Sequence, residues 1–318
     1  MSRINPNEIE SVVRREAREA GISRVLVALS GGADSVAVAY SLHKSGMEIR
    51  ALHCNFHLRG NESDRDMSFV ESFCSAHSIP LEIIHFDVIR HINDNKGLSV
   101  EMACRELRHE WFREKLRETG FQRIATGHNA DDNIETFFLN ALRGSGSRGL
   151  RGMDKDTGII WRPLLSFHRN EILDYLKDNR LEFVVDSSNL ENDYRRNILR
   201  NKIIPLMKEE WKGFDSALDK TINNLRDENR LVESVIQASL PSAGSPLSVE
   251  VILECPSPIL LIKRFIDKAE PFAVTPLEIM SAIKANKPHI RRWRLRKGAV
   301  FLRNGRLFIE MIHGEGSA

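Results

Sequence analysis

The sequence predicts an α/β fold: a doubly wound parallel sheet, followed by a helical linker and a small α+β domain. Short apolar runs alternate with helical patterns through the first two-thirds of the 318 residues, which is typical of βαβ units whose parallel sheet is covered on both faces. The charged stretch 214–239 has helical spacing and suits a connecting helix. Near the end, Asn304-Gly305 lies between two apolar runs and predicts a hairpin.

The first two-thirds of the chain carries four apolar runs that each predict a strand of the sheet. Helical spacing separates these runs, and Gly46, Gly120 and Gly144 are the expected stops of three helices. The expected strands cover 24–30, 48–54, 81–87 and 122–127, and the expected helices lie near 34–45, 63–77, 99–119 and 130–142. Ligands of such sheets bind at the carboxyl ends of the strands, and the motifs described below follow those ends.

The pattern changes after Gly144, where a glycine-rich and basic loop begins. Pro, Ser and Gly dominate 241–246, which is the composition of a linker. The expected helices of this part lie over 168–179, 214–239, 257–269 and 276–285. We expect three domains: a catalytic domain over 1–212, a helical linker over 213–245, and a small α+β domain over 246–318.

Composition excludes several classes of protein. A hydrophobic content of 42% supports a core and argues against wholesale disorder. The four cysteines form no C-x-x-C pair, which argues against a disulfide framework and a zinc ribbon. The N-terminus lacks the apolar core of a signal peptide, and no apolar run approaches the roughly 20 residues that span a bilayer. We expect a soluble cytoplasmic protein without a membrane partner.

The segment SGGADS, residues 30–35, lies between the first expected strand and its helix. Consecutive glycines let backbone N–H groups approach an anion, and the helix N-terminus adds its positive dipole end. Ser30 and Ser35 can donate hydroxyl hydrogen bonds, and Asp34 can hold Mg²⁺. The segment therefore indicates a phosphate loop, although it lacks the lysine of a Walker-type loop and an ordinary tight turn is the alternative.

A second polar cluster, ATGHNADDNIET over 125–136, also follows an expected strand and opens a helix. Asp131 and Asp132 lie in the first turn of that helix, and Glu135 follows one turn later. The alternative is that these acids only stabilise the N-terminus of the helix through its dipole. Two adjacent acids at the same sheet edge as a phosphate loop favour metal or substrate binding instead.

Two further clusters belong to the same edge. The stretch HCNFHLRGNESDRD over 53–66 follows the second strand, and its polar groups suit an adenine or a ribose, with a solvated loop as the alternative. In EMACRELRHEWF, Glu101, Arg105 and Arg108 share one helical face. An intrahelical ion pair explains the first two, whereas Arg108 is placed to reach a phosphate.

These four clusters resemble the N-type ATP pyrophosphatases, in which SGGxDS is the pyrophosphate loop, and within them the tRNA(Ile)-lysidine synthase family. The resemblance covers about the first 210 residues densely and the C-terminal part more loosely. It lies in the motifs HxNxxLRGxESDRD at 53–66, ATGHNADDNIET at 125–136, LRGSGSRGLRGM at 142–153, RPLL at 162–165 and DSSNxxxxYRRNxxRNxIIPL at 186–206. The family usually has a histidine where this chain has Phe56, with His57 beside it.

The resemblance implies a Rossmann-like fold and a ligase that joins lysine to C2 of the wobble cytidine in the CAU anticodon of tRNA(Ile), which changes codon reading from AUG to AUA. The implied substrates are ATP, free L-lysine and the tRNA, with Mg²⁺; a homodimer is left open. The implied roles are pyrophosphate binding by Ser30, Gly31, Gly32, Ala33, Asp34 and Ser35, adenine binding near His53, Mg²⁺ binding by Asp34 and Asp132, lysine binding by Asp131 and Glu135, and a catalytic set of Asp34, Asp131, Asp132 and Arg108. The division of the acids between lysine and Mg²⁺ stays open.

Two basic segments are expected to contact the tRNA. Residues 281–306 contain nine Lys or Arg and no acid, although the whole chain has a net charge of only +2, which is an electrostatic footprint for a phosphate backbone. Trp293 is placed to stack on a base, and the alternative is a strand with Trp293 and Leu295 inward and arginines outward. The expected contacts are Arg195, Arg196, Asn197 and Arg200 in one segment, and Arg291, Arg292, Arg294, Arg296 and Lys297 in the other.

Two rival functions remain open from the sequence. A tRNA thiolase of the same superfamily also adenylates a pyrimidine but needs paired cysteines or an Fe–S cluster. No two cysteines are close in sequence here, although Cys54 and Cys104 could meet in space. The second rival is an ATP-dependent RNA-binding module without chemistry.

Overall fold

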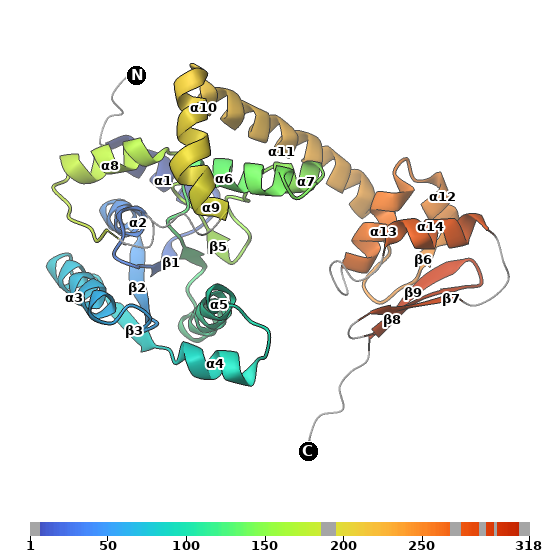
Figure 1. The fold of residues 1–318 in the computed structure, drawn as a ribbon, viewed down its shortest axis with the longest axis horizontal. Helices are drawn as coiled ribbons and strands as arrows, with labels where there is room; N and C mark the ends of the chain where they lie inside the picture. Colours follow the sequence, from blue (N-terminus) through green and yellow to red (C-terminus); the bar gives the residue numbers. More distant parts are fainter. Residues whose placement is uncertain (1–6, 186–194, 268–274, 286–290, 296–297, 312–318) are drawn as a thin grey trace. The chain divides into compact units, whose positions relative to one another are not determined.

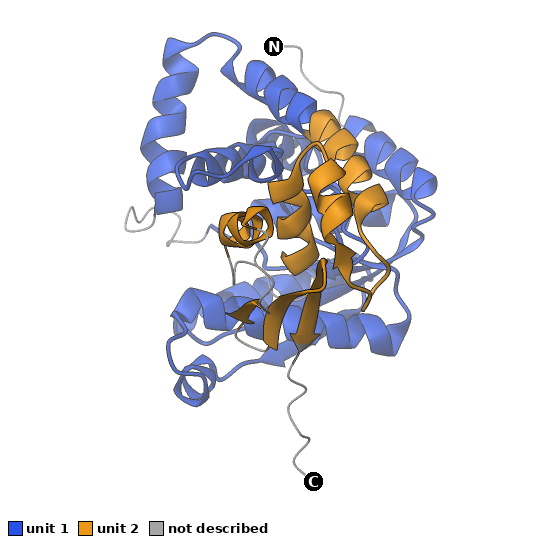
Figure 2. Cartoon of the chain, turned by 90° about the vertical axis from the view of Figure 1, so that its right-hand side faces the viewer, with its two compact units in different colours: residues 1–225 blue, residues 226–318 orange. Residues whose placement is uncertain are grey.

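The structure is a computed structural model of the chain, and it describes residues 7–185, 195–267, 275–285, 291–295 and 298–311. The chain forms two compact units, Met1–Leu225 and Arg226–Ala318 (Figure 2). The long helix α11 (Phe214–Ser239) contributes residues to both units. The division into domains over 1–212, 213–245 and 246–318 remains a prediction.

The first unit contains a five-stranded parallel sheet in the order β3-β2-β1-β4-β5. The four strands predicted from the sequence are confirmed, whereas β5 was missed because two residues are too short to produce a periodic pattern. The strands are β1 (Arg24–Ala28), β2 (Glu48–Asn55), β3 (Leu81–His85), β4 (Arg123–Ala125) and β5 (Ile160–Trp161).

Helices cover this sheet on both faces, so the doubly wound fold is confirmed (Figure 1). Successive side chains of a strand point to opposite faces. Val25 and Val27 of β1 therefore pack with α1, α2, α3 and α8, whereas Leu26 packs with Trp111 and Phe112 of α5. The helices are α1 (Asn7–Glu19), α2 (Ala33–Lys44), α3 (Asn61–Ala76), α4 (Val88–Asp94), α5 (Val100–Thr119), α6 (Ala130–Ala141), α7 (Ser147–Leu150) and α8 (Arg169–Asp178).

The ends of these helices follow local chemistry. Ser99 caps α5 by accepting a hydrogen bond from the Met102 N–H, and Gly120 ends the helix in the left-handed conformation that favours glycine. Three consecutive helical segments follow the sheet in the sequence, and we call them the helical arm; the middle segment is a π-helix. The arm consists of α9 (Arg195–Ile198), the π-helix η2 (Leu199–Ile203) and α10 (Ile204–Glu210).

The second unit is a four-stranded antiparallel sheet in the order β6-β9-β8-β7 with helices on one face (Figure 1). The predicted Asn304-Gly305 turn is present, and both residues have the positive φ that a type I′ hairpin requires. The elements are β6 (Leu247–Ser248), α12 (Val249–Glu254), α13 (Pro258–Asp267), α14 (Pro276–Lys284), β7 (Arg291–Leu295), β8 (Gly298–Arg303) and β9 (Arg306–Met311).

Trp293 and Leu295 point into the core of this unit, where they pack with Val300 and Leu307. The inward alternative raised by the sequence is therefore correct, and the placement of Trp293 as a stacking residue is not supported. Across the described parts of the chain, no helix combines the length and apolarity needed to span a membrane.

Candidate active site

The phosphate loop lies at the carboxyl end of β1 and opens α2. Gly31 has φ of +93°, which side chains rarely tolerate. The Ser35 hydroxyl accepts hydrogen bonds from the backbone N–H groups of Ser30 and Gly31, each at 3.2 Å, and donates to the Gly32 carbonyl at 2.9 Å. Ser35 therefore holds the loop in a tight arc at the helix N-terminus, where an anion is favoured.

The loop after β4 lies directly against the phosphate loop because Gly127 has no side chain. A Cβ at Gly127 would lie 2.9 Å from the Asp34 carbonyl carbon and 3.0 Å from the Ser35 backbone nitrogen. Such distances are too short for carbon and nitrogen atoms that are not bonded. Two motifs that are about 95 residues apart in sequence thus meet at one edge of the sheet, as expected for parallel strands.

Asn129 joins the acids of the two motifs. Its side-chain amide donates to Asp34 Oδ1 at 3.0 Å, and its Oδ1 accepts from the Asp132 backbone N–H at 3.0 Å. The Asp132 carboxylate in turn accepts from the Asn129 backbone N–H at 3.1 Å, which completes a capping box at the start of α6. Asn129 lies in the quoted motif ATGHNADDNIET, but its local sequence gave no sign of this bridging role.

The two carboxylates are close enough to repel each other. Burial raises the pKa of Asp34, and the charge of Asp132 raises it further, whereas the guanidinium of Arg169 opposes the shift. Arg169 forms an ion pair with Asp34 Oδ2. Two neighbouring carboxylates, one buried and one partly buried, provide the oxygen ligands that a divalent cation such as Mg²⁺ prefers.

Two arginines of the helical arm bind Asp132 and Glu135 of α6. The Nη2 atoms of Arg196 and Arg200 lie 2.9 and 2.7 Å from Asp132 Oδ1, and both Nε atoms lie 2.5 Å from oxygens of Glu135. Glu135 is only 1% exposed, so its charge depends on these partners. The arginines come from α9 and the π-helical turn η2, a geometry that often marks functional sites.

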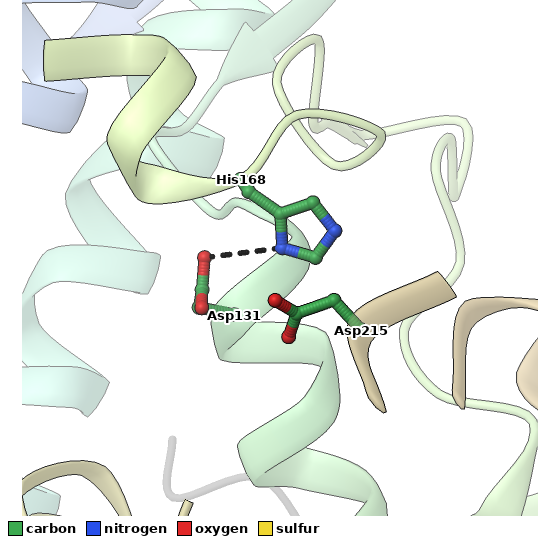
Figure 3. A group of neighbouring side chains, drawn as sticks. All are labelled: Asp131, His168 and Asp215. Carbon is green, nitrogen blue, oxygen red and sulfur yellow. Dashed lines mark ion pairs between the residues drawn. The ribbon is translucent and has the colours of Figure 1, made fainter. Parts of the chain in front are cut away.

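Asp131 belongs to a separate network of charges, in which it lies beside His168 and Asp215 (Figure 3). Lys208 of α10 donates to Asp131 Oδ1 at 2.7 Å and lies 3.0 Å from Asp215 Oδ1 of α11. His168 lies between Asp131 Oδ2, 3.4 Å from its Nδ1, and Asp219 Oδ2, 2.9 Å from its Nε2. The Lys208 ammonium thus lies between two carboxylates that, with His168, form a group able to hold a metal ion.

The ionisation of this network follows from its geometry. The carboxylates of Asp131 and Asp219, which lie beside the two ring nitrogens, raise the pKa of His168 to about 10, so the imidazole is protonated at neutral pH. Burial by itself would raise the pKa of Asp131, but His168, Lys208 and the Arg169 backbone N–H together outweigh it and lower that pKa. The sequence marked Asp131 but missed His168 and Lys208, because nothing in their local spacing connects them to it.

His53 lies at the carboxyl end of β2 and is buried. Its Nδ1 lies 2.8 Å from the Leu29 carbonyl. Burial lowers the pKa of His53, so the neutral ring donates from Nδ1 to that carbonyl and presents Nε2 as an acceptor. An acceptor at this edge suits the amino group of a purine, and the role near adenine stays a prediction.

Arg108 lies over the ring of Phe56, with its guanidinium carbon 5.4 Å from the ring centroid. Phe56 also stacks on Phe86 at 5.4 Å, in a small apolar cluster. The neighbouring His57 is turned away and lies 2.8 Å from the ring nitrogen of His85. Phe56 thus gives Arg108 an apolar support.

A group of basic side chains surrounds the loop after β4. Burial and the charges of Arg162, Arg196, Arg105 and Arg108 together lower the pKa of His128 to about 4, so this ring is neutral. The Arg162 Nη1 donates to the Asp154 backbone carbonyl, while its buried Nε has no protein partner. Positive charge at this edge suits a bound phosphate. His128 and Arg162 stand in quoted motifs, but sequence reasoning gave them no role.

The cysteines have the environment of structural rather than reactive thiols. Cys74, Cys104 and Cys255 are buried, and Cys54 is partly buried. Burial raises the pKa of Cys54 to about 12, and it also raises the pKa of Cys104. Among the described residues, no group with metal-ligand geometry contains a cysteine. Sulfur transfer and cluster binding both need thiolates, so the thiolase alternative is weakened.

The second basic segment lies on the sheet of the second unit. The side chains of Arg292 and Arg294 on β7 are exposed, and Arg291 is partly exposed. Arg296 and Lys297 lie outside the described residues. Asn197 of the first segment lies on α9 with the exposed Arg195. Contact of either segment with tRNA stays a prediction, and for Arg196 and Arg200 the observed partners are the acids of α6.

Residues 6–207 match the PP-loop domain family. The tRNA(Ile)-lysidine synthase of Porphyromonas gingivalis is 42% identical over 261 residues, which cover 80% of this chain and 57% of the relative. That of Bacteroides thetaiotaomicron is 42% identical over 237 residues, covering 74% and 55%. The chain therefore spans a little over half the length of these curated relatives.

One solved structure is similar in fold. The U34-tRNA thiolase NcsA from Methanococcus maripaludis, solved with its [4Fe-4S] cluster, superposes with a TM-score of 0.57 at 18% identity. The match covers 69% of this chain and 78% of the thiolase. At this identity the similarity supports the shared fold of the catalytic unit and carries no assignment of activity.

Proposed function

The chain belongs to the PP-loop domain family, and on that basis we propose that it joins lysine to the wobble cytidine of tRNA(Ile) at the expense of ATP. The cytidine O2 attacks the α-phosphate, the bond to pyrophosphate breaks, and the lysine ε-amine then displaces AMP from C2. Similarity to curated tRNA(Ile)-lysidine synthases supports this reaction. A reaction on tRNA also supports a cytoplasmic location, which we propose with it.

The observation that carries the proposal is the bridge made by Asn129 between Asp34 and Asp132. It fixes two carboxylates beside backbone N–H groups that open α2. Attack at the α-phosphate builds negative charge on the departing pyrophosphate, so fixed donors and a cation at this place lower the barrier. A Walker lysine would instead serve the γ-phosphate, which is not transferred in this reaction.

Asp34 and Asp132 are the residues that would hold Mg²⁺, because their neighbouring carboxylates provide oxygen ligands at the end of the phosphate loop. The ion would neutralise charge on the pyrophosphate. In the structure Arg169 neutralises Asp34, and a bound ion would take over that role and leave the half-exposed guanidinium available to a phosphate.

Asp131 is the better of the two candidates for the substrate lysine. The Lys208 ammonium between Asp131 and Asp215 demonstrates that an ε-ammonium fits this carboxylate pair. Glu135 is more deeply buried and is held by both arginine forks. We propose that Glu135 orients Arg196 and Arg200, whereas Asp131 binds the ammonium of the substrate lysine in the place that Lys208 takes in the structure.

The test is mass spectrometry of a tRNA(Ile) transcript after incubation with ATP and labelled lysine. We expect the label on the wobble cytidine, and AMP only when tRNA is present. Asp34→Asn should lose AMP formation by at least about 10²-fold and keep tRNA binding, whereas Asp174→Asn, on the exposed side of α8, should behave as wild type. An unmodified cytidine, or full activity of Asp34→Asn, would reject the proposal.

A further inference from the structure

The sheet of the second unit has one covered face and one face that its own helices leave open (Figure 2). The inward side chains Leu295, Val300 and Leu307 are at most 3% exposed and pack on α12, α13 and α14. Side chains alternate along a strand, so the residues between them point to the opposite face. That opposite face is where β7 carries Arg292 and Arg294.

A row of three residues crosses this open face. Arg292 of β7 pairs with Phe301 of β8, which pairs with Phe308 of β9. The Arg292 guanidinium carbon lies 5.4 Å from the Phe301 ring centroid, and Phe308 is 37% exposed. Two aromatic rings therefore stand on the outer face of an antiparallel sheet, beside a guanidinium that is already stacked on one of them.

The charge around this row is almost entirely positive. Four exposed arginines lie on the open face, and Glu310 is the one acid among the residues of that face that the structure describes. The arginine side chains lie on both sides of the aromatic row, toward the two ends of the strands. The four arginines are Arg292, Arg294, Arg303 and Arg306.

This combination suits RNA. Aromatic rings on a sheet stack on unpaired bases, and arginines bind the phosphates between them. A protein partner of similar size would usually bury a core depleted in charge, whereas here the charged side chains surround both rings. The positive face is complementary to a polyanion with exposed bases.

We propose that the open face of this sheet, centred on Phe301 and Phe308, binds unpaired bases of the RNA substrate. The proposal rests on the proposed function only for the identity of that RNA as tRNA. In this proposal the stacking residues are the two phenylalanines, whose rings lie on the accessible side, and not Trp293, which packs into the core. Stacking supplies affinity without sequence preference, and the arginines set the dependence on salt.

The experiment uses the whole chain, a tRNA(Ile) transcript and a short single-stranded RNA containing 2-aminopurine. We expect binding to quench the 2-aminopurine fluorescence, because the base stacks on a ring. The double variant Phe301→Leu/Phe308→Leu keeps apolar side chains in the strands and should weaken binding of both RNAs about tenfold. Arg292→Gln should lower the slope of log Kd against log salt by about 1.

Arg230→Gln is the matched control, because it removes an arginine that is 73% exposed on α11 of the same unit. It should bind RNA as the wild type does. Unchanged affinity and quenching in a folded Phe301→Leu/Phe308→Leu protein, checked by its melting curve, would overturn the inference, as would an equal loss in Arg230→Gln. If these variants weaken RNA binding but the wild type forms no lysidine, the proposed function fails and this inference stands.

Discussion

Replacing Gly127 with alanine tests whether the contact between the two motifs of the active site matters for catalysis. The added methyl carbon would lie 2.9 Å from the Asp34 carbonyl carbon and 3.0 Å from the Ser35 backbone nitrogen. Carbon atoms that are not bonded prefer about 3.5–4.0 Å. The atoms in the way belong largely to the backbone at the start of α2, so no flexible side chain can move aside.

The expected cost is that of overpacking a tight site, about 1–3 kcal/mol in the free energy of unfolding. For a unit of about 225 residues this corresponds to a melting temperature lower by about 2–12 °C. A shift of about 0.5–1 Å between Asp34 and the loop after β4 should also reduce turnover by about 10²-fold, because the reacting groups lose alignment.

The assays are thermal unfolding and AMP formation with tRNA, ATP and lysine. Gly146→Ala is the control, because Gly146 has an ordinary φ of −74° and a methyl group there would meet nothing within 4 Å. Both substitutions add the same methyl group and remove the same backbone freedom. If the two variants melt together and turn over equally, the close approach at Gly127 does not position the site.

Three further predictions concern charge and sulfur. Glu135→Gln should lower the free energy of unfolding by about 1–3 kcal/mol and turnover at least about tenfold, because two arginines that are a third or more exposed lose their anchor. In thermal unfolding, His168→Gln should be destabilised by a few kcal/mol near pH 6, and the gap from wild type should shrink between about pH 6.5 and 10. The sign follows because the folded pKa of His168 is raised, so its contribution is complete below 6.5 and lost near 10. Cys54→Ser/Cys104→Ser should keep AMP formation within about twofold, because protonated buried thiols take no part in the chemistry.

Each of these has a result that contradicts it. Glu209→Gln, at an exposed position of α10, controls for the loss of one acid, and an equal effect would remove the special role of Glu135. A gap between wild type and His168→Gln that does not change with pH would show that His168 is not held protonated. Loss of turnover in the double cysteine variant would revive the thiolase reading.

The elements of the fold could largely be predicted from local sequence. The strands around Val25–Val27 and 48–54 are apolar runs, and glycines such as Gly120 stop the helices because only they accept the final conformation easily. Backbone state depends mainly on neighbours within one turn or one strand, so this information is local. The sequence did not predict β5, because a strand of two residues is too short to show an alternating pattern.

The position of the phosphate loop and of the α6 acids also followed from sequence, because the carboxyl ends of parallel strands meet at one edge. The partners of those acids did not. Arg196 and Arg200 read as basic residues for tRNA, yet they bind Asp132 and Glu135. A guanidinium pairs equally well with a phosphate or a carboxylate, so local sequence cannot distinguish them.

By itself, the sequence determined the parallel sheet, the phosphate loop and which edge carries the chemistry. Only the tertiary structure decided that Asn129 joins two acids, that Lys208 neutralises Asp131, and that Trp293 faces the core. The physical reason is one of range. Helices and strands follow from interactions between near neighbours, whereas each of these pairings joins side chains that meet only after the chain has folded.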